Sequence, residues 1–281
     1  NDKAFRGNQV YEWLWSKGAH SFEDMTNVSK GTRTMLETHF VINHIKVDTM
    51  QRSEDGTVKN AVRLHDGLVV ESVLIPTNTR TTACVSSQVG CSLDCNFCAT
   101  ARLKRMRNLE PAEIYDQVIA IDKESRLYYN HPLSNIVFMG MGEPLANVDV
   151  VYDACKRLCS DWGFSARHIT VSTVGVVPGM KKMAKWDLPV TLAISLHSPY
   201  DDKRSEMIPL NKRYDIAEVL KAGEDVSHKH GRRVSFEYCA IDDKNINDKT
   251  AHELGNLLRD FNGAGGAHVN IIPLNQTSGF R

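Results

Sequence analysis

The feature that most constrains the fold of this sequence is a regular alternation of short apolar runs and amphipathic segments, beginning near residue 80. Each apolar run has the length of a strand, and each one except the last is followed by a segment long enough for a helix. The predicted strands cover residues 81–86, 135–139, 168–172, 190–195, 233–240 and 268–274. The predicted helices cover residues 111–128, 148–161, 178–186, 214–229 and 248–261. This order predicts a parallel sheet with right-handed crossover connections.

The number of repeats predicts the class of fold. Six strand–helix units are fewer than the eight of a closed barrel, so we expect an α/β fold built as a curved, incomplete (β/α)6 barrel. In such sheets the functional residues gather at the carboxyl ends of the strands. The unusual residues of this sequence follow those ends, since a cysteine triplet follows the first predicted strand and residues 140–144 follow the second.

The first 79 residues have a different pattern. Residues 1–43 predict a small helical accessory segment, and residues 26–29 have the composition of a helix N-cap. Residues 44–79 predict a β extension, with a hairpin between 58–64 and 68–75 that turns at His65-Asp66-Gly67. The partial barrel is then expected over residues 80–281.

Composition places the chain among ordinary globular proteins. It has 281 residues, of which 42% are hydrophobic, and its 34 basic residues balance 34 acidic ones. The zero net charge excludes a surface that is basic overall, so any nucleic-acid contact must be local. There is no run of eighteen apolar residues and no apolar signal segment at the start. We therefore expect a cytoplasmic protein without membrane contact, most simply a monomer.

The cysteine triplet is the strongest chemical motif. Cys91, Cys95 and Cys98 have a C-x3-C-x2-C spacing that offers three thiolates, whereas closed structural metal sites usually take four protein ligands. A [4Fe-4S] cluster held by three cysteines leaves one iron open, and we expect S-adenosylmethionine to bind there. The alternative is a zinc site completed by a distant residue, for which the candidates are His131, Cys155 and Cys239.

Other candidate residues lie after the predicted strands. The run Gly140-Met141-Gly142-Glu143-Pro144 combines glycines, which allow close approach to a ligand, with a carboxylate that can accept hydrogen bonds from an ammonium group. Ser172, Ser195, His197 and Asn275 are weaker candidates, because serine caps, structural histidines and turn asparagines are common.

Cys84 and Glu71 stand apart from these. Cys84 ends the strand that leads to the triplet, where it is either a small buried residue or a nucleophile or base. Glu71 interrupts an apolar run, so it is either an outward-facing strand residue or a functional acid. Cys155, Cys159 and Cys239 have the spacing of packed core residues.

Taken together, these motifs resemble the RlmN/Cfr family of radical S-adenosylmethionine RNA methyltransferases, and its RlmN branch most closely. The resemblance covers nearly the whole chain. It rests on residues 5–9, 22–27, 84–100, 139–145, 171–173, 194–197 and 272–275.

The resemblance implies roles for individual residues. Cys91, Cys95 and Cys98 correspond to the cluster ligands, Glu71 to a proton acceptor, and Cys84 to the cysteine that resolves a covalent RNA adduct. The positions that correspond to S-adenosylmethionine contacts are Gly142, Glu143, Ser172, Ser195, Leu196, His197 and Asn275. A disulfide bond is a further family feature that the resemblance implies.

The resemblance also implies a reaction and partners. The family methylates carbon 2 of an adenosine in the peptidyl-transferase centre of 23S rRNA and one in the tRNA anticodon loop, through a methylated cysteine. An electron donor such as flavodoxin is expected. The methyl-carrying cysteine lies in a C-terminal Ala-Cys-Gly-like segment that these 281 residues do not contain. If residues 1–281 are all that exists of the protein, we expect cleavage of S-adenosylmethionine without methylation of RNA.

Three alternative functions remain at this point. They are methylation of carbon 8 of the same rRNA adenosine, a non-catalytic zinc-dependent RNA-binding protein, and a radical enzyme acting on a protein or small molecule. For RNA contact the sequence offers the basic run Arg102, Lys104, Arg105 and Arg107. A second candidate basic patch is made of Lys203, Arg204, Lys212 and Arg213.

Overall fold

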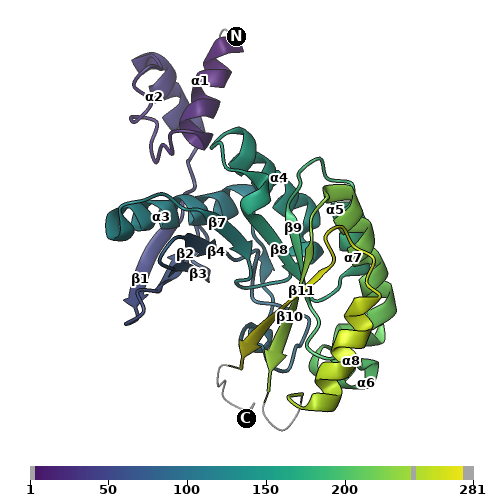
Figure 1. Ribbon diagram of the computed structural model, residues 1–281. Helices are drawn as coiled ribbons and strands as arrows, with labels where there is room; N and C mark the ends of the chain where they lie inside the picture. The colour runs from purple at the N-terminus through teal and green to yellow at the C-terminus, as the bar shows by residue number, and fades with distance from the viewer. Residues whose placement is uncertain (1–3, 242–244, 275–281) are drawn as a thin grey trace.

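A single mixed sheet organises the protein. The computed structural model describes residues 4–241 and 245–274. Within these residues nine strands form one sheet, in the order β1-β2-β3-β4-β7-β8-β9-β10-β11. The sheet curves but does not close, as Figure 1 shows, because β1 and β11 end it on opposite sides. The expected incomplete barrel is therefore confirmed.

The strands from β4 to β11 pair in parallel, each with its neighbour in the order above. Every one of these strands was predicted to within two residues at each end. Their bounds are β4 Thr81–Cys84, β7 Asn135–Phe138, β8 Ile169–Thr173, β9 Thr191–Ser195, β10 Val234–Ala240 and β11 Ala267–Pro273. The connecting helices are α3 Pro111–Tyr129, α4 Val148–Ser160, α5 Val177–Met183, α7 Ile216–His230 and α8 Asp248–Arg259.

The helix starts are explained by local chemistry. Glu110 and Glu113 form a capping box at the start of α3, where Pro111 takes the first helical position. Asp215 accepts a hydrogen bond from the Glu218 amide at the start of α7, and Gly231 ends that helix with φ +62°.

The β extension continues the barrel sheet. Its strands are β1 Lys46–Arg52, β2 Val58–Arg63 and β3 Val69–Pro76, and they pair antiparallel in sequence order. β3 also pairs antiparallel with β4, so that Val73 lies opposite Cys84. The predicted hairpin is confirmed, and it widens the sheet on the side of the first barrel strand.

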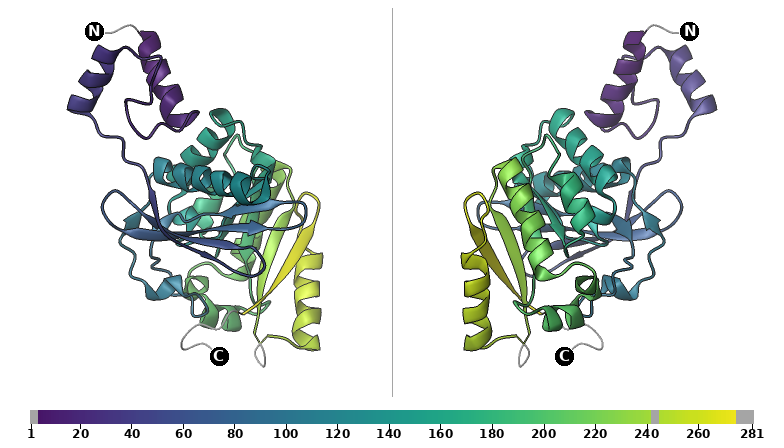
Figure 2. Two further views of the ribbon diagram at one scale, coloured as in Figure 1. Left: turned by 90° about the vertical axis from the view of Figure 1, so that its left-hand side faces the viewer. Right: turned by 90° about the vertical axis from the view of Figure 1, so that its right-hand side faces the viewer.

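The N-terminal segment is a small helical unit that stands apart from the sheet in Figure 2. It contains α1 Ala4–Trp15 and α2 Lys30–His39 around its own apolar cluster of Ala19, Phe22, Met25 and Val28. Ser29 caps α2, as predicted, by accepting a hydrogen bond from the Thr32 amide. The unit contacts the barrel through the Trp15 ring, which packs edge-on against Tyr115 and lies 4.0 Å below the Arg157 guanidinium.

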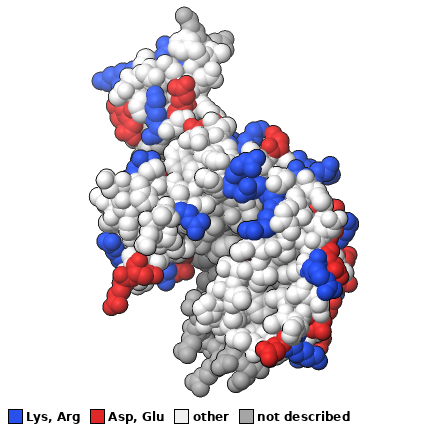
Figure 3. All heavy atoms as spheres, in the orientation of Figure 1, with Lys and Arg blue, Asp and Glu red and all other residues white. Residues whose placement is uncertain are grey.

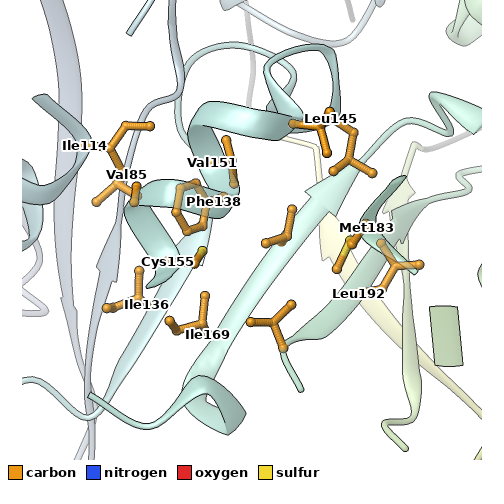
Figure 4. Close-up of a cluster of buried hydrophobic side chains, with 14 of the residues drawn as sticks. Val85, Ile114, Ile136, Phe138, Leu145, Val151, Cys155, Ile169, Met183 and Leu192 are labelled. Carbon is orange, nitrogen blue, oxygen red and sulfur yellow. The ribbon is translucent and has the colours of Figure 1, made fainter. Parts of the chain in front are cut away.

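The two faces of the sheet differ in chemistry because successive side chains of a strand point to opposite faces. The helix-covered face carries buried apolar residues such as Ile136, Phe138, Ile169 and Leu192, which form the main core together with side chains from the helices (Figure 4). The opposite face carries Cys84 in register with Val137 on the neighbouring strand, and Ser195 in register with Glu237 and Asn270. That second, more polar face is where the candidate residues of the strands lie.

Helix α6, Asp201–Met207, was missed by the sequence analysis. It is a single short helix whose sequence Asp-Asp-Lys-Arg-Ser-Glu-Met has no apolar periodicity. It exists because Arg204 and Met207 are buried on its inner side. No helix among the described residues is long and apolar enough to span a membrane.

Truncating a side chain of the buried core should lower the stability of the protein. Phe138, which is 1% exposed, lies at the centre of the residues in Figure 4. Phe138→Ala should lower the free energy of unfolding by roughly 3–5 kcal/mol, because it removes buried contacts and leaves a cavity. Urea unfolding would measure the change.

Leu127→Ala is the matched control, since Leu127 is 74% exposed on α3. It should change the free energy of unfolding by less than about 0.5 kcal/mol. Equal losses in the two variants would contradict the assignment of the core.

Candidate functional site

The cysteine triplet lies on a loop that other parts of the chain hold in shape. The Cys91 amide donates to the Leu103 carbonyl oxygen at 3.2 Å, and the Asn96 amide donates to that of Met207 in α6 at 3.0 Å. Gly90 has φ +74°, and a Cβ there would lie 2.4 Å from the Lys104 carbonyl oxygen. The loop therefore needs glycine immediately before the first cysteine.

Two of the three thiols, those of Cys95 and Cys98, share an apolar environment. Cys95 is buried, and it packs in a cluster with Ile208, Ile241 and Phe97 that also includes Cys98. Burial, together with the neighbouring thiols, raises the pKa of the Cys95 thiol to about 12. Sulfur donors in a dry environment suit iron–sulfur chemistry. Burial disfavours the charged thiolates, and a bound metal would supply the positive charge that stabilises them.

The zinc alternative needs a fourth ligand near the triplet. Cys155 lies in the main core and His131 follows α3 at the far ends of the strands, so neither is near the loop. Cys239 packs in the same cluster as Cys95. Across residues 4–241 and 245–274, no group of three or more His, Cys, Asp or Glu side chains converges closely enough to hold a metal ion, and because this includes the triplet it favours neither metal.

All seven cysteines lie within the described residues and are free thiols. The disulfide that the resemblance implied is therefore not present between any of them. Cys155 is buried in the main core and Cys159 packs against it, as the sequence pattern predicted.

The run from Gly140 to Pro144 passes directly beside the strand that precedes the cysteines. A Cβ on Gly140 would lie 2.8 Å from Val85 backbone atoms, and one on Gly142 would lie 2.5 Å from the Gln88 side chain. Gly142 also has φ +98°, which favours glycine. The Glu143 amide donates to Gln88 Oε1 at 2.9 Å, so Gln88 joins the two segments.

Glu143 is the buried carboxylate of the site. Its Oε1 accepts a hydrogen bond from the Leu145 amide at 2.9 Å, and its Oε2 accepts one from the Val174 amide at 3.0 Å. It thereby connects the loops that follow β7 and β8. Burial raises the pKa of Glu143 to about 7, against the effect of these hydrogen bonds. A cationic ligand beside it would favour the charged form.

His197 has an unusual conformation and one unsatisfied atom. Its backbone has φ +59°, and its Nδ1 accepts a hydrogen bond from the Cys239 amide at 2.9 Å. Burial lowers the pKa of His197 to about 3, so the ring is neutral and Nε2 carries the proton. Nε2 is buried and has no partner within the described part of the chain. Because a buried donor without an acceptor is costly, this atom indicates a missing ligand.

His197 also connects the strand ends to the cysteine loop. Its ring packs edge-on against Phe97, between Cys95 and Cys98 in sequence, with ring centroids 4.5 Å apart. Ser195 ends β9, and the amide of Leu196, which follows it, donates to the Glu237 carbonyl oxygen. Ser172 lies on β8 and is half-buried. Asn275 lies outside the described residues.

Cys84 and Glu71 share the polar face of the sheet. Cys84 lies opposite Val73, two residues from Glu71 along β3, so both side chains point to the same side. Burial raises the pKa of the Cys84 thiol to about 11. Glu71 is exposed and pairs with Lys59 at 3.2 Å, so it is an outward-facing strand residue on the face that carries Cys84.

The basic segment after the cysteines divides into two parts. Arg107 is occupied internally, because its guanidinium donates to Asp66 at 2.6 Å and to both oxygens of Glu113 at 2.7 Å. Lys104 and Arg105 are exposed, as is Arg102, which has an interaction of its own. On the face in Figure 3, basic and acidic residues are interspersed.

The prediction of a second basic patch was wrong for one of its residues. Arg204 is fully buried, so it cannot belong to a surface patch with Lys203, Lys212 and Arg213. The sequence analysis missed this residue and Gln88 as parts of the site. No spacing rule singles out either one, although Gln88 lies three residues before the first cysteine of the triplet.

Comparisons with known proteins are consistent with this geometry. Residues 85–254 match the Radical SAM superfamily, and residues 1–42 match the Ribosomal RNA large subunit methyltransferase N-terminal domain. A relative from Flavobacterium johnsoniae, named probable dual-specificity RNA methyltransferase RlmN, is 68% identical over 89% of this chain and 72% of its own length. The dual-specificity RNA methyltransferase RlmN 2 of Myxococcus xanthus is 44% identical over 99% of this chain and 74% of its own length.

A solved structure shows the same fold. The crystal structure of a radical SAM methyltransferase from Sphaerobacter thermophilus matches with a TM-score of 0.89 and 40% identity. The match covers 97% of this chain and 79% of that one.

The buried carboxyl group of Glu143 predicts a pH dependence of stability. A folded-state pKa raised from 4.5 to about 7 means that the folded protein holds the proton more tightly than the unfolded chain. The free energy of unfolding of the cofactor-free protein should therefore fall as pH rises between these values, on the order of 3 kcal/mol. Urea unfolding at about pH 5 and about pH 8 would measure it.

Glu143→Gln is the comparison variant, because Gln cannot ionise. Its loss of stability between the two pH values should be smaller than that of the unchanged protein. Identical pH dependence in both proteins would contradict a raised pKa at Glu143.

Proposed function

The chain belongs to the radical S-adenosylmethionine superfamily and to its RlmN family of RNA methyltransferases, and we propose on that basis that it methylates carbon 2 of an adenosine in 23S rRNA and in tRNA. The observation that carries the proposal is the meeting of the cysteine loop, Glu143 and His197 at the carboxyl ends of the strands. Carbon 8 methylation is not favoured, because the relatives at 68% and 44% identity carry RlmN names.

Cys91, Cys95 and Cys98 are proposed as the ligands of a [4Fe-4S] cluster. The free thiols and the apolar packing of Cys95 and Cys98 support this assignment. Such a cluster supplies the electron that cleaves bound S-adenosylmethionine. The loop residues keep water away from the thiols, since Leu93 and Phe97 pack in the same apolar cluster.

The residues proposed to bind S-adenosylmethionine surround this loop. Glu143 would accept a hydrogen bond from the amino group, which a pKa near 7 allows once the cation arrives. His197 would donate from Nε2, the buried atom that now has no acceptor. Gly142 leaves room for the ligand, while Ser172, Ser195 and Leu196 line the strand ends, and Asn275 completes the proposed set.

Cys84 and Glu71 are proposed to handle the proton that leaves the adenine ring. Their shared face supports the pairing, because a base lying over that face is accessible to both side chains. The pKa of Cys84 at about 11 keeps it a thiol at neutral pH, so it must lose its proton before it can act as a base. Glu71, exposed beside Lys59, is the proposed acceptor.

RNA is proposed to approach next to the cysteine loop. Lys104 and Arg105 are the basic side chains of that segment that extend into solvent, whereas Arg107 organises the segment through its ion pairs. An adenosine must leave its stack to reach the site. We also propose that the protein works as a cytoplasmic monomer with an electron donor such as flavodoxin, since free thiols and a cluster require a reducing compartment.

The function is tested first by anaerobic reconstitution with iron and sulfide. Electron paramagnetic resonance of the reduced protein should give a four-iron signal that changes when S-adenosylmethionine is added. Cys95→Ala should lose the signal, because the cluster then has two ligands. Cys159→Ala, on the distant helix α4, should keep it. A colourless protein that holds stoichiometric zinc would overturn the proposal.

RNA contact is tested by charge reversal. The double variant Lys104→Glu and Arg105→Glu should bind RNA roughly tenfold or more weakly at low salt and should show a smaller salt dependence, because phosphate contacts are lost. Lys221→Glu is the control, since Lys221 lies 72% exposed on α7, away from the cysteine loop. Unchanged affinity in the double variant, measured by filter binding, would refute the assignment.

A further inference from the structure

Arg204 is a fully buried cation that the proposed reaction does not use. It is 0% exposed and is the largest fully buried side chain within the described residues. It lies in α6, a helix with an otherwise polar sequence. Arginine is almost never fully buried unless its charge is balanced.

The direct partners of Arg204 are all neutral. Its guanidinium donates to the carbonyl oxygens of Val174 at 2.6 Å, Ser195 at 2.9 Å and Leu196 at 3.2 Å. It also donates to Asn211 Oδ1 at 2.5 Å. These bonds satisfy the donors and fix the orientation of the group, but they leave its charge uncompensated.

The carboxylate of Asp201 acts on Arg204 without binding it directly. Asp201 contributes to the electrostatic environment of Arg204, yet its Oδ1 accepts hydrogen bonds from the Asn211 side chain at 2.8 Å and the Ile216 amide at 2.9 Å. Among the described residues Arg204 forms no ion pair, and Asp201 is exposed to solvent, which weakens its effect.

Arg204 lies next to the cysteine loop. Met207 and Ile208, which follow it by three and four residues, pack in the cluster that contains Cys95. The Ile208 amide donates to the Arg204 carbonyl oxygen at 2.7 Å, and the Asn96 amide donates to that of Met207. The charges of Arg204 and the Cys95 sulfur act on each other. The buried cation therefore lies beside the position that an anionic metal–sulfur group held by the cysteines would occupy.

We propose that Arg204 is a positioning residue whose fixed positive charge balances the anionic metal–sulfur group held by Cys91, Cys95 and Cys98 and raises its reduction potential. This inference rests on the proposed function, because it requires a cluster at these cysteines. The same side chain joins the ends of β8 and β9 through the carbonyl groups of Val174, Ser195 and Leu196.

The effect on the potential follows from charge. Reduction adds one electron, drawn from an external one-electron reductant, and makes the buried site more negative by one unit without forming or breaking a bond. A nearby cation stabilises the more negative state, and burial strengthens that stabilisation relative to water. The guanidinium is already held by four oxygens, so it needs little reorganisation when the charge arrives.

The test is a reductive titration of the reconstituted protein, followed by electron paramagnetic resonance. Arg204→Gln should make the one-electron reduction at least tenfold less favourable, a shift of 59 mV to more negative potential. Arg204→Lys keeps the charge and should stay near the unchanged protein. Asn211→Ala loosens the hydrogen bonding of Arg204 but keeps its charge, so it controls for structural effects and should also stay near the unchanged protein.

Equal potentials in Arg204→Gln and the unchanged protein would overturn the proposal, and so would equal shifts in Arg204→Gln and Asn211→Ala. If the Gln variant does not fold, Arg204→Lys decides when its potential is followed as pH rises, because a buried Lys loses its charge far more readily than Arg. Its potential should fall at high pH relative to that of the unchanged protein, and the same pH dependence in both proteins would refute the role of charge. Failure of the unchanged protein to assemble a cluster would instead refute the proposed function.

Discussion

Parallel pairing of the strands from β4 to β11 is the constraint on which the rest of the structure depends. Parallel strands require crossover connections, so every carboxyl end opens at the same edge of the sheet. The cysteine loop, the Gly140–Pro144 run and the turn at His197 come from three different strand ends. They meet because the strands share one direction, although up to about a hundred residues separate them in sequence.

The site is also a concentration of buried polar groups, each held by backbone atoms. Glu143 accepts from two amides, His197 accepts from one, and Arg204 donates to three carbonyl groups. These contacts keep the side chains in place before any ligand binds, which is the preorganisation that catalysis needs. Within the part of the chain that the structure describes, the proton on His197 Nε2 lacks an acceptor and the charge of Arg204 lacks a directly bound counterion.

The β extension enlarges the face of the barrel sheet that carries candidate functional residues. Because β3 pairs with β4, the face that carries Cys84 continues onto a strand that carries Glu71. The N-terminal helical unit adds a second, smaller contact through Trp15, Tyr115 and Arg157.

The sequence by itself determined the strands, most helices and the cysteine motif, because each has a local signal in the period of apolar residues, in caps or in spacing. It did not determine α6, whose seven residues have no such period and become helical through the burial of Arg204 and Met207. It placed Arg204 and Arg107 on basic surfaces, since a charge in a sequence carries no record of its partners. Only the tertiary structure decided that one is buried beside a thiol and the other is paired with Asp66 and Glu113, because burial and ion pairing are set by residues distant in sequence.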